Sequence, residues 1–142
     1  MKAVPRSTRW QVTVEFGDCD PAGIAFYPNF LRWYDASTRH FFQACGVPPW
    51  RELERAEGII GTPVVEATSR YLRPVSYGDA ITVDTWVEEW RARSFVLRHE
   101  LRHGGELCSE GREVRVFAVR QAGDGTRIRA IPVPPHIEAM CR

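Results

Sequence analysis

Two aspartates in a segment rich in glycine and proline, followed by a helix start, are the residues of this chain best suited to chemistry. The segment runs from Glu15 to Asn29 and reads EFGDCDPAGIAFYPN. Pro28 suits the first turn of a helix, because a proline there loses no hydrogen bond. A helix start leaves backbone N–H groups unpaired and carries partial positive charge. The pattern therefore predicts a carboxylate close to an oxyanion site.

Three side chains in this segment compete for the role of reacting group. Asp20 precedes Pro21, and an aspartate in such a place often only caps a turn. Asp18 stands where the preceding strand ends, which suits a structural hydrogen bond to the turn. Cys19 has no histidine tied to it by a motif, and lone cysteines are usually small buried apolar residues. A thiol nucleophile is therefore disfavoured.

The elements that must position this segment are read from hydrophobic periodicity. Apolar residues alternate from Trp10 to Phe16, which predicts a strand ending at Gly17. A helix is expected from Pro28 to Cys45, and its apolar residues cover more than half of its circumference, so we expect it to be mostly wrapped. A second helix is expected from Trp50 to Glu57. The remaining chain predicts strands at Val64–Leu72, Ala80–Trp90, Phe95–His103, Glu106–Arg120 and Arg127–Val133.

Short breaks between these strands imply antiparallel neighbours. One long helix followed by a run of antiparallel strands predicts an α+β fold with the sheet curled around the helix. A chain of 142 residues without repeats or linkers fits one domain, 1–142. Pairing of exposed sheet edges between two copies favours a homodimer.

Composition narrows the function class. The 19 basic and 18 acidic residues leave a net charge of +1, so we expect no general attraction to nucleic acid or to an anionic membrane. No apolar run has the length of a membrane span, and the first residues lack the apolar core of a signal peptide. We therefore expect a soluble protein in the cytoplasm.

A metal centre is not predicted. The four cysteines, at positions 19, 45, 108 and 141, form no C-x-x-C pair. His99 and His103 are four residues apart, but in a predicted strand and turn this spacing does not place them on one face. We therefore expect neither a metal nor a disulfide framework.

Several motifs spread over nearly the whole chain carry a family resemblance. They are the segment Glu15–Ile24 with Tyr27-Pro28-Asn29, Arg32-Trp33, Asp35-Ala36, Cys45-Gly46, Pro48–Arg51, Gly61-Thr62-Pro63, Glu89-Trp90-Arg91 and Arg129-Ala130-Ile131. Together they resemble the Pseudomonas-type 4-hydroxybenzoyl-CoA thioesterase family. Members of this family have the hotdog fold, in which the sheet wraps a central helix, dimers share a continuous sheet and active sites lie between subunits. The α+β fold read from periodicity agrees with this resemblance.

The resemblance implies roles for individual residues. Asp20 is the expected catalytic carboxylate, and the backbone N–H of Tyr27 is expected to polarise the thioester carbonyl. Asp35 matches a position that accepts a hydrogen bond from a phenolic hydroxyl of the substrate across the dimer interface; otherwise it is a surface acid. Thr62, with Gly61 before it, lies in a family position beside the reacting group, although turn formation is its simpler role.

Coenzyme A carries phosphates, so a basic rim is expected. Arginine binds phosphate oxygens with two hydrogen bonds. The family carries an unbroken basic triplet in the turn where this chain has Ala92, so individual phosphate contacts stay open. The candidates are Arg91, Arg93, Ser94, Arg127 and Arg129.

These observations predict an acyl-CoA thioesterase that hydrolyses an aromatic ester, best 4-hydroxybenzoyl-CoA. Asp20 acts as nucleophile or as general base, and the sequence does not separate the two. A broader aryl- or medium-chain acyl-CoA thioesterase is an alternative, and so is a noncatalytic acyl-CoA-binding protein. No cofactor is expected beyond the coenzyme A of the substrate, and the expected assembly is a homotetramer, a dimer of dimers.

Overall fold

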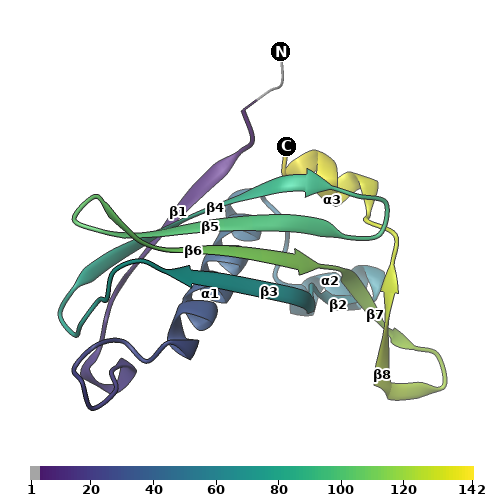
Figure 1. Ribbon diagram of the computed structural model, residues 1–142. Helices are drawn as coiled ribbons and strands as arrows, with labels where there is room; N and C mark the ends of the chain where they lie inside the picture. The colour runs from purple at the N-terminus through teal and green to yellow at the C-terminus, as the bar shows by residue number, and fades with distance from the viewer. Residues whose placement is uncertain (1–3) are drawn as a thin grey trace.

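The computed structural model describes residues 4–142, in which one long helix crosses one face of an antiparallel sheet (Figure 1). The sheet has five strands in the order β1-β4-β5-β6-β3. β3 therefore forms one edge and β1 the other. The strands are β1 (Ser7–Thr13), β3 (Val64–Tyr71), β4 (Ala80–Trp90), β5 (Phe95–His103) and β6 (Glu106–Arg115).

The central hairpin of this sheet confirms the prediction from alternating residues. β4 and β5 have the predicted bounds, and along β4 the side chains of Ile81, Val83 and Thr85 point to the buried face. The two strands pair antiparallel from Ile81 opposite His103 to Trp90 opposite Phe95. A period of two places every second residue on the same face, so one face of the hairpin covers the helix.

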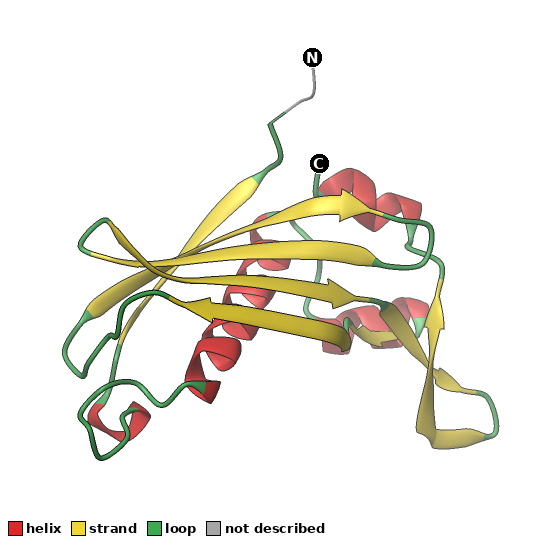
Figure 2. Ribbon diagram, viewed as in Figure 1, coloured by secondary structure: helices red, strands yellow, loops and turns green. Residues whose placement is uncertain are grey.

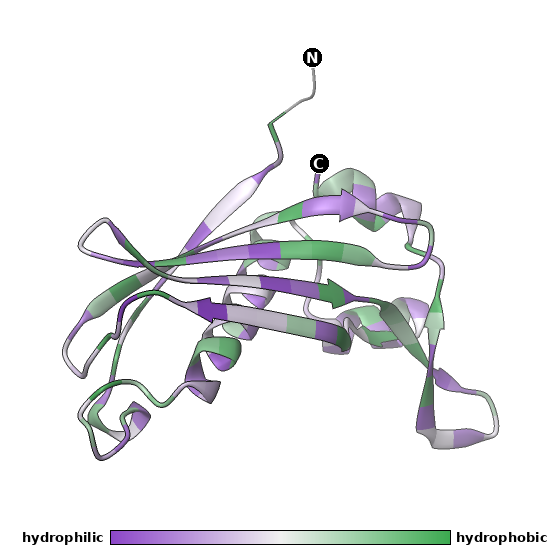
Figure 3. Ribbon diagram, viewed as in Figure 1, coloured by the Kyte–Doolittle hydropathy of each residue, from purple (hydrophilic) through white to green (hydrophobic). Residues whose placement is uncertain are grey.

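Helix α1 (Pro28–Ala44) begins at the predicted proline. Phe30, Trp33, Tyr34 and Phe41 are among its buried residues, and Figure 3 shows hydrophobic and hydrophilic residues alternating along it. The expectation that the helix is mostly wrapped is wrong for the single chain. The sheet covers one face only, and the opposite face, with Leu31 38% exposed, stays open.

The predicted strand Glu106–Arg120 is wrong as one element, because the chain leaves the first sheet at Val116. The N–H of Val116 donates to the carbonyl of Pro63 at 3.2 Å, outside the ladder. The chain continues as β7, the centre of a second sheet in the order β2-β7-β8. This sheet contains β2 (Ile59–Gly61), β7 (Phe117–Gln121) and β8 (Asp124–Ile131), seen at the right of Figure 2.

Other predicted bounds need smaller corrections. The first strand ends at Thr13 rather than at Gly17, because its pairing with β4 stops where Thr13 meets Ala80. Glu15 and Asp18 then cap a 3₁₀ turn, Phe16–Asp18. α2 (Trp50–Glu57) is confirmed and ends at Gly58, whose φ of 77° favours glycine. β2 and the C-terminal helix α3 (Pro135–Met140) were not predicted.

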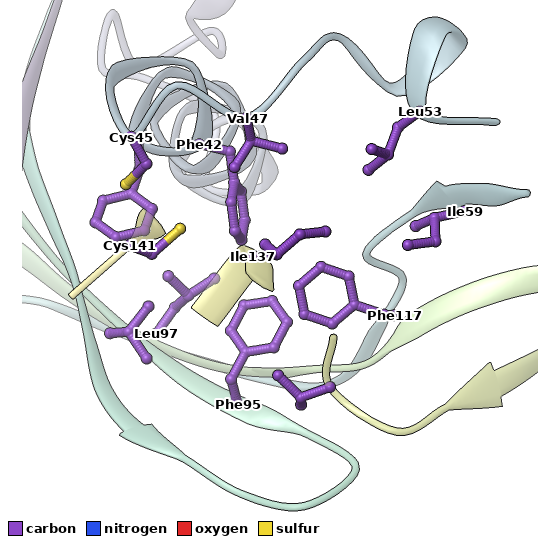
Figure 4. Close-up of a cluster of buried hydrophobic side chains, with 13 residues drawn as sticks. Phe42, Cys45, Val47, Leu53, Ile59, Phe95, Leu97, Phe117, Ile137 and Cys141 are labelled. Carbon is purple, nitrogen blue, oxygen red and sulfur yellow. The ribbon is translucent and has the colours of Figure 1, made fainter. Parts of the chain in front are cut away.

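Two clusters of buried side chains fix the helix to the sheets. One lies around the C-terminal half of α1 and includes Phe42, Phe95, Phe117 and Ile137 (Figure 4). The other lies at its N-terminal half and includes Phe30, Trp33, Tyr34, Ala25 and Val14. The second cluster lies beneath the segment that leads into α1, so the acid-bearing loop rests on packed core.

Candidate active site

The loop before α1 is a tight turn held by backbone hydrogen bonds. The Asp20 N–H donates to the Ile24 carbonyl, and the Gly23 N–H donates to the Asp20 carbonyl, both at 2.9 Å. Gly23 has φ of 82°, a conformation that residues with a Cβ rarely adopt. Ser76 donates its hydroxyl to the Gly23 carbonyl at 2.6 Å, which ties the turn to the connection between β3 and β4.

The Asp20 carboxylate is half-buried at this turn. Its Oδ1 accepts a hydrogen bond from the Ala22 N–H at 2.8 Å. Its Oδ2 has no hydrogen-bond partner among residues 4–142, and no cationic side chain of that range forms an ion pair with it. One oxygen therefore orients the side chain while the other is free to react.

The start of α1 supplies the expected N–H group. Tyr27 precedes Pro28, and its carbonyl accepts hydrogen bonds from the Phe30 N–H at 3.2 Å and from the Tyr71 hydroxyl at 3.3 Å. The Tyr27 N–H itself has no acceptor within the described chain, 4–142. A free N–H at a helix start carries part of the positive end of the helix dipole. It can stabilise an oxygen on which negative charge develops.

Asp18 is held in place by hydrogen bonds to its carboxylate and its carbonyl. One carboxylate oxygen accepts from Arg32 at 2.6 Å and the other from the Glu15 N–H at 2.9 Å, and its carbonyl accepts from Asn29 at 2.7 Å. Both carboxylate oxygens are therefore occupied. The Cys19 thiol is directed to the Glu15 carbonyl at 3.7 Å, a backbone contact typical of a structural cysteine.

A separate cavity of about 370 Å³ holds the other predicted acyl-site residues. Asp35, Gly61 and Thr62 all line it, together with Trp50 of α2. The Asp35 side chain is 69% exposed, whereas Thr62 is buried. Gly61 has φ of 147°, which allows the sharp change of direction between β2 and β3.

Arg115 is a residue of this cavity that the sequence interpretation missed. Its side chain is only 5% exposed, yet it donates to Asp35 at 3.0 Å, to the Thr62 carbonyl at 3.1 Å and to Glu113 at 3.0 Å. The sequence carried a signal for this residue, because Glu113 and Arg115 are oppositely charged residues two apart within one predicted strand. Such spacing puts both on one face, where burial requires that they be paired.

Behind Arg115 the polar contacts continue into the core. The Glu113 carboxylate accepts from His99 Nε2 at 2.6 Å, and His99 Nδ1 is 2.8 Å from the Thr85 hydroxyl. Burial lowers the pKa of His99, which favours the neutral imidazole. Burial alone would raise the pKa of Glu113, but the hydrogen bond from His99 and the charge of Arg115 lower it overall.

The predicted basic residues gather at the far end of the hairpin. The β4–β5 turn closes with the Arg91 N–H donating to the Ser94 carbonyl at 2.9 Å, and Arg93 donates to the Ala130 carbonyl at 3.1 Å. This places the turn beside β8 and the exposed Arg129. Arg127, further along β8, pairs with Asp124 at 3.4 Å.

Within one folded chain, the acid-bearing loop and this basic cluster lie at opposite ends of the five-stranded sheet (Figure 1). β4 begins next to the loop, where the Val14 N–H donates to the Asp79 carbonyl, and ends at the basic turn. The 11 residues of β4 make ten steps, which span about 33 Å and separate the loop from the basic turn. Within residues 4–142, no three metal-ligating side chains gather into a metal site, and no helix is long and apolar enough to cross a membrane.

Comparison with known proteins shows the family and the fold of this chain. The family model of the thioesterase-like superfamily matches residues 14–140. The chain is 45% identical over 141 residues to 4-hydroxybenzoyl-CoA thioesterase of Pseudomonas sp. (strain CBS-3), covering 96% of this chain and 98% of that protein. The solved structure of that thioesterase superposes with a TM-score of 0.91 at 42% identity, covering 96% of this chain and 99% of that chain.

Two further solved structures extend the comparison. A variant of 4-hydroxybenzoyl CoA thioesterase complexed with 4-hydroxybenzoyl CoA has a TM-score of 0.91 at 43% identity, over 96% of this chain and 99% of that chain. A gentisyl-coenzyme A thioesterase has a TM-score of 0.81 at 33% identity, over 92% and 99%. The expected hotdog fold is therefore confirmed, and the chain belongs to the thioesterase-like superfamily.

Proposed function

We propose that this protein hydrolyses an aromatic acyl-CoA thioester, best 4-hydroxybenzoyl-CoA, to 4-hydroxybenzoate and CoA. The observation that carries the proposal is that two groups without partners occur in the segment that leads into α1. One is Oδ2 of Asp20 and the other is the N–H of Tyr27, neither of which has a partner within residues 4–142. The relative from Pseudomonas, 45% identical over nearly the whole length, supports the choice of substrate.

Asp20 can act on the thioester by either of two routes. As a nucleophile, its oxygen bonds to the acyl carbon, the C–S bond breaks, CoA leaves as a thiolate and water then cleaves the mixed anhydride. As a general base, it takes a proton from water while the water oxygen attacks the same carbon. Either route places negative charge on the carbonyl oxygen, where the Tyr27 N–H donates. A donor of this type typically lowers the barrier by about 3 kcal/mol.

The acyl ring is assigned to the cavity that Asp35, Gly61 and Thr62 line. Asp35 accepts the hydrogen bond of the phenolic hydroxyl, and Thr62 orients water or the thioester beside the reacting carbon. The CoA phosphates are assigned to the basic end of the hairpin, with Arg93 and Arg129 as the nearest pair. Arg91, Ser94 and Arg127 flank them, and Ala92 leaves a gap in the basic turn.

A second copy of the chain would complete this site. β3 is an edge strand whose exposed apolar residues include Val64, Val65 and Tyr71, and an exposed edge of this kind favours pairing. Tyr71 contacts Tyr27, whereas Val64 lines the cavity of Asp35. Antiparallel pairing of β3 with the partner's β3 brings the acid-bearing loop of one chain to the acyl cavity of the other.

Two such dimers form a tetramer, each chain being one domain over 1–142. The reaction requires no metal or organic cofactor besides the coenzyme A of the substrate. The cytoplasm is the proposed compartment, since all four cysteines are free thiols, as a reducing compartment maintains them.

Release of free thiol by the purified protein tests the proposal. Hydroxybenzoyl, benzoyl and lauroyl esters of CoA are compared, and we expect the hydroxybenzoyl ester to have the highest kcat/KM. Asp20→Asn keeps the size of the side chain and is expected to abolish turnover while ester binding persists. Equal rates on all three esters favour the broader thioesterase, and ester binding without thiol release favours a noncatalytic binding protein.

A trapping experiment separates the two routes of Asp20. In a single turnover in heavy-oxygen water, the nucleophile route places solvent oxygen in the Asp20 carboxylate if water attacks the aspartyl carbon of the mixed anhydride, and the product then carries the old aspartate oxygen. Mass spectrometry of the Asp20 peptide and of the product detects where the label lies. Label in the product alone means that water attacked the acyl carbon, as the general-base route requires, and a mixed anhydride trapped at Asp20 under the same conditions would contradict that route.

A further inference from the structure

Arg115 joins the two walls of the acyl cavity. Its guanidinium donates to Asp35 on α1 at 3.0 Å and to the Thr62 carbonyl, between β2 and β3, at 3.1 Å. These are the two polar residues assigned to the acyl ring and the thioester. One side chain therefore fixes the distance between them.

Arg115 is itself held from behind. Glu113, only 3% exposed, accepts from Arg115 through both oxygens, at 3.2 and 3.0 Å. His99, fully buried, donates through Nε2 to the same carboxylate at 2.6 Å, and its Nδ1 lies 2.8 Å from the Thr85 hydroxyl. Both terminal nitrogens of the guanidinium have acceptors, and its Nε is buried without a partner among residues 4–142. A different arrangement of this buried ion pair would leave a charge unpaired in the core.

Asp35 needs such a support more than the other residues of the cavity. Its side chain is 69% exposed, so without a partner it would sample several rotamers in solvent. Arg115 occupies Oδ1, and Oδ2 has no partner among residues 4–142. The carboxylate thus presents one free oxygen in one direction, which is what recognition of a single hydroxyl requires.

We propose that Arg115 is a positioning residue that sets the preference of the acyl cavity for a hydroxylated aromatic ring, by holding the Asp35 carboxylate against the Thr62 backbone. This inference rests on the proposed function, in which Asp35 accepts the phenolic hydrogen bond. Arg115 does not contact the substrate in this role. Its side chain acts through Asp35, and Glu113 with His99 keeps it in place.

The test is the ratio of kcat/KM for 4-hydroxybenzoyl-CoA to kcat/KM for benzoyl-CoA. We expect Arg115→Met to lower this ratio about tenfold, in line with the loss of a hydrogen bond to a charged group. When Arg115→Met is added to Asp35→Ala, we expect the double variant to have the same ratio as Asp35→Ala alone. A purely structural role of Arg115 would instead slow both esters equally, and that result overturns the inference.

Two further variants guard against loss of folding. Arg115→Met leaves Glu113 buried without its cation, so the double variant Arg115→Met with Glu113→Gln removes both charges together. Arg115→Lys keeps the charge but places it on a single nitrogen, which cannot span the acceptors of Asp35, Thr62 and Glu113 as the two terminal nitrogens of the guanidinium do. Circular dichroism and a cooperative melting transition show which of these variants are folded. We expect the ratio to be lowered in every Arg115 variant that is folded. A folded Arg115 variant with the original ratio contradicts the inference.

Arg39→Met is the matched control, because Arg39 lines the same cavity and makes no hydrogen bond to Asp35 in the structure. We expect its ratio to stay unchanged. An equal fall in Arg39→Met would assign the effect to positive charge in general and overturn the inference. An unchanged ratio in Asp35→Ala contradicts the proposed function instead, whereas a fall in Asp35→Ala without a fall in the Arg115 variants contradicts this inference alone.

Discussion

The ring of Tyr34 lies flat against the imidazole of His99, with 4.8 Å between the ring centres and 3° between the planes. The Tyr34 hydroxyl also bonds to Ser109 at 2.7 Å and lies 3.0 Å from Ser69. Tyr34 is thus fixed to three strands of the sheet. Because Asp35 is the next residue on α1, this contact sets the rotation of the helix that presents Asp35.

Gly111→Ala is expected to destabilise the fold through Tyr34. A Cβ at Gly111 would lie 2.5 Å from Cε2 of Tyr34, closer than any real contact. Because Tyr34 is packed on both sides, we expect a loss of about 1–3 kcal/mol in the free energy of unfolding. Urea denaturation followed by tryptophan fluorescence measures it.

Gly125→Ala is the control for this prediction. Gly125 also lies in a strand, has no atom within 4 Å of an added Cβ and does not have positive φ. We expect a change of less than about 0.5 kcal/mol. Equal losses in the two variants would show that Tyr34 is not the cause.

The stability of the protein should fall on acidification partly because of His99. Burial lowers the pKa of His99 below its ordinary 6.5, so the unfolded chain binds a proton there that the folded chain does not. Stability therefore decreases as the pH falls from about 6.5 towards the folded pKa. Glu113, whose folded pKa is also lowered, contributes stability that is lost only below its ordinary 4.5.

The measurement is the melting temperature of the protein and of His99→Gln between pH 7.5 and 5.5. Glutamine keeps a donor for Glu113 but does not titrate. We expect a flatter pH dependence in His99→Gln, even where its melting temperature is lower throughout. Parallel curves for the two proteins would mean that other histidines account for the acid sensitivity.

Subunit mixing tests whether the site is shared between chains. In a heterodimer of Asp20→Asn with Asp35→Ala, a shared site leaves one intact combination, with Asp20 from one chain and Asp35 from its partner. We expect the heterodimer, purified through two different tags, to prefer hydroxybenzoyl-CoA over benzoyl-CoA as the unmodified protein does. A preference equal to that of Asp35→Ala would place both acids of each site in one chain.

Val65→Lys is expected to break the dimer. Val65 lies on the β3 edge and is 61% exposed in the single chain, so pairing of two copies would bury the introduced charges. We expect a lower molar mass in light scattering and a parallel loss of turnover. Val4→Lys, at a position 91% exposed near the N-terminus, is the control. A monomeric Val65→Lys with full activity would refute the shared site.

Arg129→Ala should weaken binding of the CoA arm without affecting the chemistry. Arg129 is exposed next to Ala130, which accepts from Arg93. We expect KM for 4-hydroxybenzoyl-CoA to rise about tenfold with kcat unchanged. KM for a 4-hydroxybenzoyl-pantetheine thioester, which lacks phosphates, should not change. Arg55→Ala makes the same change of net charge on α2, and an equal effect there would argue against a specific contact.

The sequence by itself determined the local elements and the acid-bearing loop. Alternation fixed the bounds of β4 and β5, and Pro28 fixed the start of α1, because these signals arise from neighbouring residues. The same locality explains the errors. The strand expected from Glu106 to Arg120 breaks at Val116, whose N–H bonds to Pro63, a residue far away in sequence.

Only the tertiary structure decided which charged groups meet. Asp35 and Arg115 are 80 residues apart, and no local pattern relates them. Packing of α1 on the sheet brings them within 3.0 Å, since a buried guanidinium must find its acceptors wherever the fold supplies them. The sequence identified the residue types capable of the chemistry, and the three-dimensional packing placed them in one cavity.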